Sequence, residues 1–214
     1  IGIPDFLNKA LLNSDQPFGA LVKKLMDAGN TLVDVPLPTN QYALAAYYII
    51  MSAEVSTNLA RLDGMRYGHA VRGETLLDDY INSRTEGFGK ETRRRILLGT
   101  FVLSSGYIDA YYRKAQAVRS LLRAEYEKAF EKVDVIMTPT AFSVAFKFGE
   151  KSDPLSMYFE DMFTVTANLT GMPAISVPAG KVDGLPVGVH FTAPHQAEET
   201  LFAAGGAVES VRAK

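Results

Sequence analysis

Apolar side chains recur at helical spacing along most of the chain, and shorter apolar runs lie between these stretches. The helical spacing predicts helices at residues 15–28, 42–62, 91–103, 108–132, 162–169 and 197–211. Runs rich in β-branched residues predict strands at 31–35, 133–137, 174–178 and 187–192, and residues 1–4 also have the character of a strand. Because strands alternate with helices, the sequence predicts an α/β fold.

Turn residues divide these elements without marking a domain boundary. Asp183-Gly184 separates two apolar runs and predicts a β-hairpin. Residues 61–72 and 87–89 break the periodicity and are expected to be loops. Since the chain has no internal repeat and no linker-like composition, we expect one compact α/β unit spanning residues 1–214. Residues 1–4 carry neither an initiator Met nor a signal-peptide pattern, so we expect a fragment or a processed product.

Composition excludes several classes of function. The 22 basic and 24 acidic residues leave a net charge of -2, which gives no electrostatic reason to expect unaided binding to nucleic acid. Cysteine is absent, so disulfides, thiolate nucleophiles and Cys-type zinc sites are excluded. The three histidines are too scattered to suggest a metal site. No apolar run approaches the length of a membrane span, and we expect no membrane partner.

Motifs for an activated serine are missing from the chain. There is no Gly-x-Ser-x-Gly, no Ser-x-x-Lys and no Gly/Ser-rich loop that leads into a helix. Ser104-Ser105-Gly106 follows an apolar periodic run, and it is best interpreted as a helix end with a glycine stop. We therefore expect no catalytic residue within this chain.

Three consecutive arginines, Arg93, Arg94 and Arg95, fall on the predicted helix at 91–103. Successive helical residues are about 100° apart, so the three cannot share one face. If the apolar face is centred on residues 98, 101 and 102, Arg94 and Arg95 flank it and Arg93 faces solvent. A flanking arginine is either a surface residue with a buried stem or an anion binder that reaches into a cleft.

Two further residues could contribute to a binding site. Asp161 lies in an apolar stretch where a carboxylate needs a partner, although it could instead cap a helix beginning at Met162. Tyr47 lies with Tyr48 on a largely apolar helix and could be a core residue. An arginine, an aspartate and a tyrosine together would complement the carboxylate and ammonium groups of an α-amino acid.

Several stretches resemble the amidase signature family, and within it the glutaminase subunits of glutamyl-tRNA(Gln) amidotransferases. These stretches are residues 47–50, 54–68, 84–91, 98–107, 109–112, 138–141, 168–178 and 184–188. The resemblance covers nearly the whole chain and is weakest before Ala43. It implies the C-terminal part of the amidase-signature fold, with a mixed sheet flanked by helices.

The resemblance also implies a function. In that family the glutaminase subunit hydrolyses glutamine, and the ammonia is used by a partner subunit that amidates Glu-tRNA(Gln) with ATP and Mg²⁺. The expected partners are therefore the other amidotransferase subunits, glutamine and, through the complex, Glu-tRNA(Gln), in the cytoplasm or an organelle. No cofactor is expected in this chain itself.

The family's catalytic Ser, cis-Ser and Lys lie in its N-terminal half, and no position of this chain matches them. The resemblance instead implies a glutamine-binding role for Tyr47, Arg95 and Asp161, with Arg94 as the alternative arginine. We therefore expect the chain to form part of the substrate-binding surface without supplying the nucleophile. The chain alone is expected to be inactive and prone to self-association. Two alternatives remain, a non-catalytic scaffold protein and a fragment of another amide hydrolase.

Overall fold

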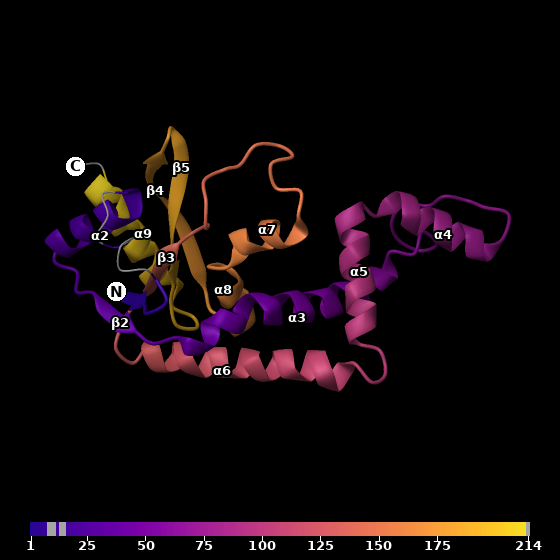
Figure 1. The fold of residues 1–214 in the computed structure, drawn as a ribbon, viewed down its shortest axis with the longest axis horizontal. Helices are drawn as coiled ribbons and strands as arrows, with labels where there is room; N and C mark the ends of the chain where they lie inside the picture. Colours follow the sequence, from indigo (N-terminus) through magenta and orange to yellow (C-terminus); the bar gives the residue numbers. More distant parts are fainter. Residues whose placement is uncertain (8–11, 13–15, 213–214) are drawn as a thin grey trace. The chain divides into compact units, whose positions relative to one another are not determined.

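The computed structural model describes residues 1–7, 12 and 16–212, and the chain forms two compact units. One unit comprises Ile1–Leu44 and Val118–Lys214 and contains the sheet; the other, Ala45–Ala117, is helical. Figure 1 shows the order of the elements along the chain. Where the sequence analysis expected one compact unit, the contacts of the chain divide it into these two.

The first unit is built on a five-stranded sheet with the order β2-β1-β3-β5-β4. Its strands are β1 (Gly2–Pro4), β2 (Val33–Val35), β3 (Ile136–Pro139), β4 (Ala174–Val182) and β5 (Leu185–Thr192). Strand β1 is parallel to β2 and β3, whereas β5 is antiparallel to β3 and β4. The sheet is therefore mixed, and the predicted α/β class is confirmed.

The predicted hairpin joins β4 to β5. Val182 pairs with Leu185, so only Asp183 and Gly184 form the turn. Both have positive φ, 49° and 81°, which is the conformation that a two-residue turn with a right-handed strand twist requires. The Asp-Gly pair thus explains why the chain reverses here.

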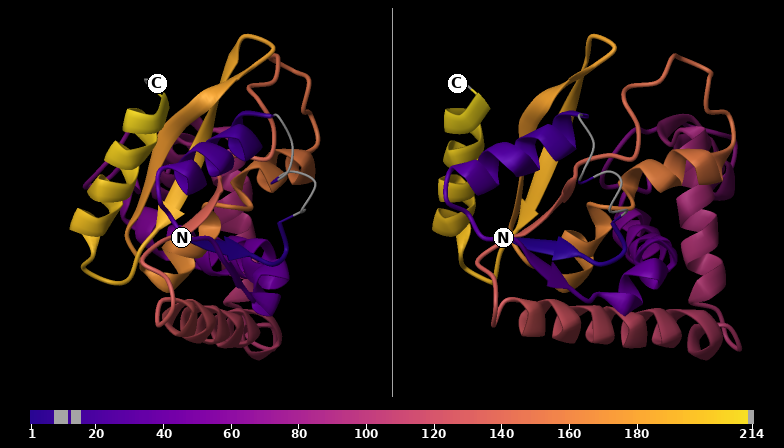
Figure 2. Two further views of the ribbon diagram at one scale, coloured as in Figure 1. Left: turned by 90° about the vertical axis from the view of Figure 1, so that its left-hand side faces the viewer. Right: turned by 60° about the vertical axis from the view of Figure 1, so that its left-hand side comes forward.

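Helices cover both faces of the sheet. Strand residues Val189 and Phe191 point toward α2 (Pro17–Asp27) and α9 (Glu198–Arg212), which lie together on one side of the hairpin in Figure 2. Ile136 points the other way, into a second cluster with Tyr126 of α6 (Arg113–Ala129). This alternation buries both sides of β3, as expected for a strand covered on two faces.

The chain between β3 and β4 forms short helical segments. They are α7 (Pro154–Tyr158), the 3₁₀ turn η4 (Phe159–Asp161) and α8 (Val165–Thr170). The helix predicted to begin at Met162 therefore begins three residues later. It ends where Gly171 adopts a positive φ of 74°, a conformation that favours glycine. A further 3₁₀ turn, η1 (Pro38–Tyr42), precedes the second unit.

The second unit contains most of α3 (Ala43–Asn58), followed by η2 (Leu59–Arg61), α4 (Leu76–Gly87), α5 (Lys90–Val102) and the π-helical turn η3 (Ile108–Tyr112). Helix α4 was not predicted from periodicity. Its start is nevertheless encoded locally, because the side chains of Thr75 and Asp78 each accept a hydrogen bond from the other's backbone N–H. Among the helices of the described residues, none combines the length and apolar composition needed to cross a bilayer.

A close approach of α5 to α3 organises this unit. A Cβ added to Gly99 would lie 1.9 Å from the carbonyl oxygen of Ser52, so only glycine fits at this contact. One residue further, Thr100 Oγ1 lies 3.0 Å from Ser56 Oγ. The predicted apolar face of α5 is only partly right: Val102 is buried as expected, but Leu98 and Phe101 are 39% and 45% exposed, and Gly99 is buried instead. A small residue, not a large apolar one, marks the packed side.

Candidate functional site

Arg95 lies on the packed side of α5, one turn before Gly99, and its guanidinium group contacts Glu91, Met51 and Tyr48. Nε donates to Glu91 Oε1 at 2.9 Å, and Nη1 donates to the sulfur of Met51 at 3.6 Å. The guanidinium carbon lies 5.4 Å from the centroid of the Tyr48 ring, within cation–π range. With a side chain 29% exposed, Arg95 is a positioned cation that remains accessible.

The two neighbouring arginines are held less firmly. Arg94 Nη1 donates to the second carboxylate oxygen of Glu91 at 3.0 Å, and its side chain is 42% exposed. Arg93 is exposed and lines a cavity of about 330 Å³ together with Arg84 and Phe88. Geometry thus distinguishes Arg95 from Arg94 by its contacts with α3, which sequence periodicity left open.

Tyr47 lies on α3 beside Tyr48, within the same unit as Arg95. Its ring is half-buried and meets the Tyr48 ring edge-on, with centroids 5.3 Å apart. Tyr48 therefore contacts both predicted residues, a link that the sequence analysis did not identify. The signal was present, because Tyr48 and Met51 are three residues apart and share one face of α3.

Asp161 is the last residue of η4 in the sheet unit, and it is exposed. Its backbone oxygen accepts hydrogen bonds from the N–H of Thr164 at 3.0 Å and from Thr164 Oγ1 at 3.1 Å. The residue that precedes α8 is Thr164, not Asp161. The helix-capping interpretation of Asp161 is therefore wrong for a helix beginning at Met162.

The residue before Asp161 belongs to a polar network that the sequence analysis missed. Glu160 accepts hydrogen bonds from the backbone N–H of Ser143 at 3.0 Å and from Ser143 Oγ at 2.9 Å, and it pairs with Lys151. Burial alone would raise the pKa of Glu160, but the hydrogen bonds from Lys151 and Ser143 outweigh it and hold this pKa below its usual value. The group is therefore a carboxylate at neutral pH.

The loop after β3 lines a cavity of about 720 Å³. Thr140 anchors this loop, because its N–H donates to the Gly188 carbonyl at 3.0 Å and its Oγ1 lies 2.6 Å from Ser176 Oγ. Phe18, Phe163 and Val187 contribute to the apolar walls, while Ser143 lies on the side of the Glu160 network. Residues 139–145 of β3 and the following loop therefore border a cavity.

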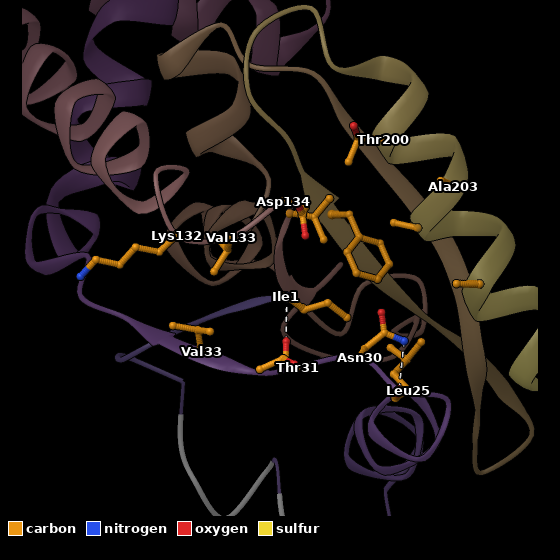
Figure 3. A pocket seen from close by; sticks show the side chains of 15 residues that line it. Ile1, Leu25, Asn30, Thr31, Val33, Lys132, Val133, Asp134, Thr200 and Ala203 are labelled. Carbon is orange, nitrogen blue, oxygen red and sulfur yellow. Dashed lines mark hydrogen bonds between the residues drawn. The ribbon is translucent and has the colours of Figure 1, made fainter.

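Another cavity, of about 560 Å³, lies between the N-terminal ends of β1, β2 and β3 and helix α9, as shown in Figure 3. Its polar lining includes Asn30, Thr31 and Asp134, while the Lys132 ammonium group extends away from it. Tyr47, Arg95 and Asp161 line none of these three cavities. Within the described residues there is also no group of three or more His, Cys, Asp or Glu side chains that could hold a metal ion.

The site residues therefore fall into two described groups. In the helical unit, Arg95 offers guanidinium donors suited to a carboxylate, beside Tyr47 and Tyr48. In the sheet unit, Asp161 offers a carboxylate suited to an ammonium group. None of these residues is a serine that could act as a nucleophile.

Comparison with known proteins gives this chemistry a family context. A family model described as Amidase matches residues 1–202. The chain is 56% identical over 187 residues to the A subunit of glutamyl-tRNA(Gln) amidotransferase from Maricaulis maris, an alignment that covers 86% of this chain and 38% of that protein. The protein of the same name from Thermoanaerobacter pseudethanolicus is 56% identical over 176 residues, covering 81% and 36%. The chain thus spans less than half the length of these relatives.

Solved structures agree with the fold. The crystal structure of the A subunit of glutamyl-tRNA(Gln) amidotransferase from Thermotoga maritima matches with a TM-score of 0.70 and 35% identity, covering 97% of this chain and 41% of that one. A crystal structure of an amidase matches with a TM-score of 0.74 and 24% identity, covering 98% and 45%; at this identity the likeness shows the fold alone. The family match and the identity to the two relatives show that this chain belongs to the amidase family.

Proposed function

We propose that the chain is the glutamine-recognising part of the glutaminase subunit of a tRNA-dependent amidotransferase. In this role it serves a reaction in which glutamine is hydrolysed and the ammonia converts Glu-tRNA(Gln) to Gln-tRNA(Gln). The observation that carries the proposal is the positioned guanidinium group of Arg95, on a chain 56% identical to proteins named as the A subunit of such an enzyme. A general amide hydrolase has no need of a fixed cation for an α-carboxylate.

Charge assigns the role of each residue. Arg95 pairs with the α-carboxylate of glutamine, because a guanidinium fork matches a carboxylate in two parallel hydrogen bonds. Tyr47 supplies a hydroxyl group beside it, and Asp161 pairs with the α-ammonium group. Glu91 and Tyr48 hold Arg95 without contacting the substrate. The nucleophile and its proton-transfer groups are supplied from outside residues 1–214.

The remaining parts of the reaction belong to partners. ATP and Mg²⁺ are used by another subunit of the complex, which also contacts the tRNA, and this chain holds no cofactor of its own. A net charge of -2 fits a subunit that meets tRNA only through its partners. We place the complex in the cytoplasm or an organelle, where tRNA is charged.

Steady-state glutaminase kinetics of the assembled enzyme test the proposal. Arg95→Gln removes a charge-assisted pair with the substrate, which is worth about 1.5–3 kcal/mol and raises KM for glutamine roughly 10- to 100-fold. Arg93→Gln, an exposed change on the same helix, is the control and leaves KM unchanged. A large effect of Arg94→Gln with none of Arg95→Gln would move the role to Arg94. Unchanged KM in both variants would contradict recognition by this helix.

A further inference from the structure

The segment that carries Asp161 is tied to the sheet by a compact polar cluster, which we call the Glu160 latch and define as Ser143, Lys151 and Glu160. Glu160 Oε2 accepts the backbone N–H of Ser143, while Oε1 accepts Ser143 Oγ and the Lys151 ammonium group. Lys151 Nζ also donates to Ser143 Oγ at 3.3 Å. All three residues and Asp161 belong to the sheet unit.

The Lys151–Glu160 ion pair of the latch is partly shielded from solvent, whereas Ser143 is exposed. The side chains of Lys151 and Glu160 are 21% and 15% exposed. The Lys151 ammonium group also lies 4.7 Å from the centroid of the Phe146 ring. An ion pair in such a setting is less screened than one on the surface, and removing one partner leaves the other poorly solvated. The latch therefore constrains the loop more strongly than an exposed pair could.

Its position in the chain gives the latch a specific mechanical effect. Ser143 follows the end of β3 by four residues, and Glu160 directly precedes Asp161. The hydrogen bonds from Ser143 to Glu160 close the base of the intervening loop, whose far side is ordered by α7 with its Asp153 cap. Since Thr140 is itself bonded to Gly188 of β5, η4 is linked back to the sheet. The backbone of Asp161 is thereby held in place.

We propose that the Glu160 latch positions Asp161 and so sets the preference of the enzyme for amides that carry an α-ammonium group. This inference rests on the proposed pairing of Asp161 with that group. Ser143, Lys151 and Glu160 are positioning residues, because they act through Asp161 and do not contact the substrate. Without the latch, Asp161 samples several positions, and the ammonium group loses its fixed partner.

The test compares glutamine with glutaramate, which is glutamine without its α-amino group. In the assembled enzyme, KM for glutamine and the inhibition constant of glutaramate are measured for Glu160→Gln and Lys151→Met. Each variant is expected to raise KM for glutamine by about tenfold, as loss of a partly buried charge interaction would, with kcat and the glutaramate constant nearly unchanged. Lys147→Met, an exposed change in the same loop, is the matched control.

Two further variants make the outcome decisive. The exchanged pair Lys151→Glu with Glu160→Lys restores opposite charges and is expected to recover part of the glutamine affinity. If the latch variants weaken the binding of glutamine and glutaramate equally, the latch has a merely structural role and the inference is overturned. Asp161→Asn distinguishes the latch inference from the proposed role of Asp161. If Asp161→Asn weakens the binding of glutamine but not that of glutaramate, and the latch variants show no such selective effect, only the latch inference is contradicted. If Asp161→Asn leaves the selectivity unchanged, the role of Asp161 fails and the latch inference fails with it.

Discussion

Gly99→Ala tests whether the contact between α5 and α3 supports the candidate site. The added Cβ would lie 1.9 Å from the Ser52 carbonyl oxygen and 2.6 Å from the Ser56 Cβ. The nearest obstacle is backbone, which cannot rotate away as the end of a long side chain can. The two helices must therefore separate, and Arg95 moves with α5 away from Tyr48 on α3.

The expected change in the free energy of unfolding combines two opposing effects. Alanine in place of glycine favours a helix by about 1 kcal/mol. Overpacking costs about 1–3 kcal/mol, and a clash with rigid backbone belongs at the upper end of that range. The free energy of unfolding should therefore fall by about 2 kcal/mol in Gly99→Ala.

Gly206→Ala is a matched control, because Gly206 also lies inside a helix and, apart from the nearby backbone of that helix, no atom of the described residues lies within 4 Å of the position of its Cβ. The free energy of unfolding of Gly206→Ala should rise by the helix contribution alone, about 1 kcal/mol. Urea unfolding of wild type and both variants measures the two effects, and glutamine KM reports the displacement of Arg95. A Gly99→Ala protein as stable as Gly206→Ala would refute the close packing of α5 on α3.

Two other changes probe the buried polar face of the sheet. Burial lowers the pKa of His190 to about 4. Between pH 6.5 and 4 this histidine is therefore protonated in the unfolded chain but not in the folded one. The free energy of unfolding should decrease by roughly 3 kcal/mol as the pH is lowered through that window. His190→Gln should abolish this loss while His195→Gln, at an exposed position, keeps it; equal slopes in wild type and His190→Gln would contradict the assignment. Thr138 Oγ1 is buried and has no hydrogen-bond partner within the described residues, so Thr138→Val should leave stability unchanged or raise it. Thr170→Val, which removes a 2.8 Å hydrogen bond, should cost about 1 kcal/mol in the same urea titration, and a larger loss in Thr138→Val would show an interaction of that hydroxyl.

Local signals in the sequence predicted much of the sheet unit. The Asp183-Gly184 turn and the β-branched runs encode the hairpin and β3 through interactions between near neighbours. Such signals are weaker where tertiary packing determines whether a segment forms a strand. Strand β1 has only three residues and is defined mainly by its partners β2 and β3.

The helical unit was harder to predict because its packing does not follow apolar periodicity. Helix α5 meets α3 through Gly99, and large apolar residues such as Leu97 are 71% exposed. A pattern that centres on large apolar side chains therefore selects the wrong face. Helix α4 has little apolar periodicity, and its clear signal was the spacing of Thr75 and Asp78.

The candidate site shows the same division between local and long-range information. The arginine triplet indicates an inward cation, but only the contacts with Tyr48 and Met51 separate Arg95 from Arg94. Lys151 and Glu160 are nine positions apart with α7 between them, and no regular spacing predicts their pairing. Contacts made across loops depend on the folded path of the chain.

The central claim is that residues 1–214 recognise glutamine for a nucleophile that lies outside them. The most direct measurement is to treat the assembled enzyme with an electrophilic glutamine analogue and to locate the adduct by peptide mass spectrometry. The account predicts an adduct on a serine outside residues 1–214, formed more slowly after Arg95→Gln. An adduct on a residue within 1–214 would contradict it.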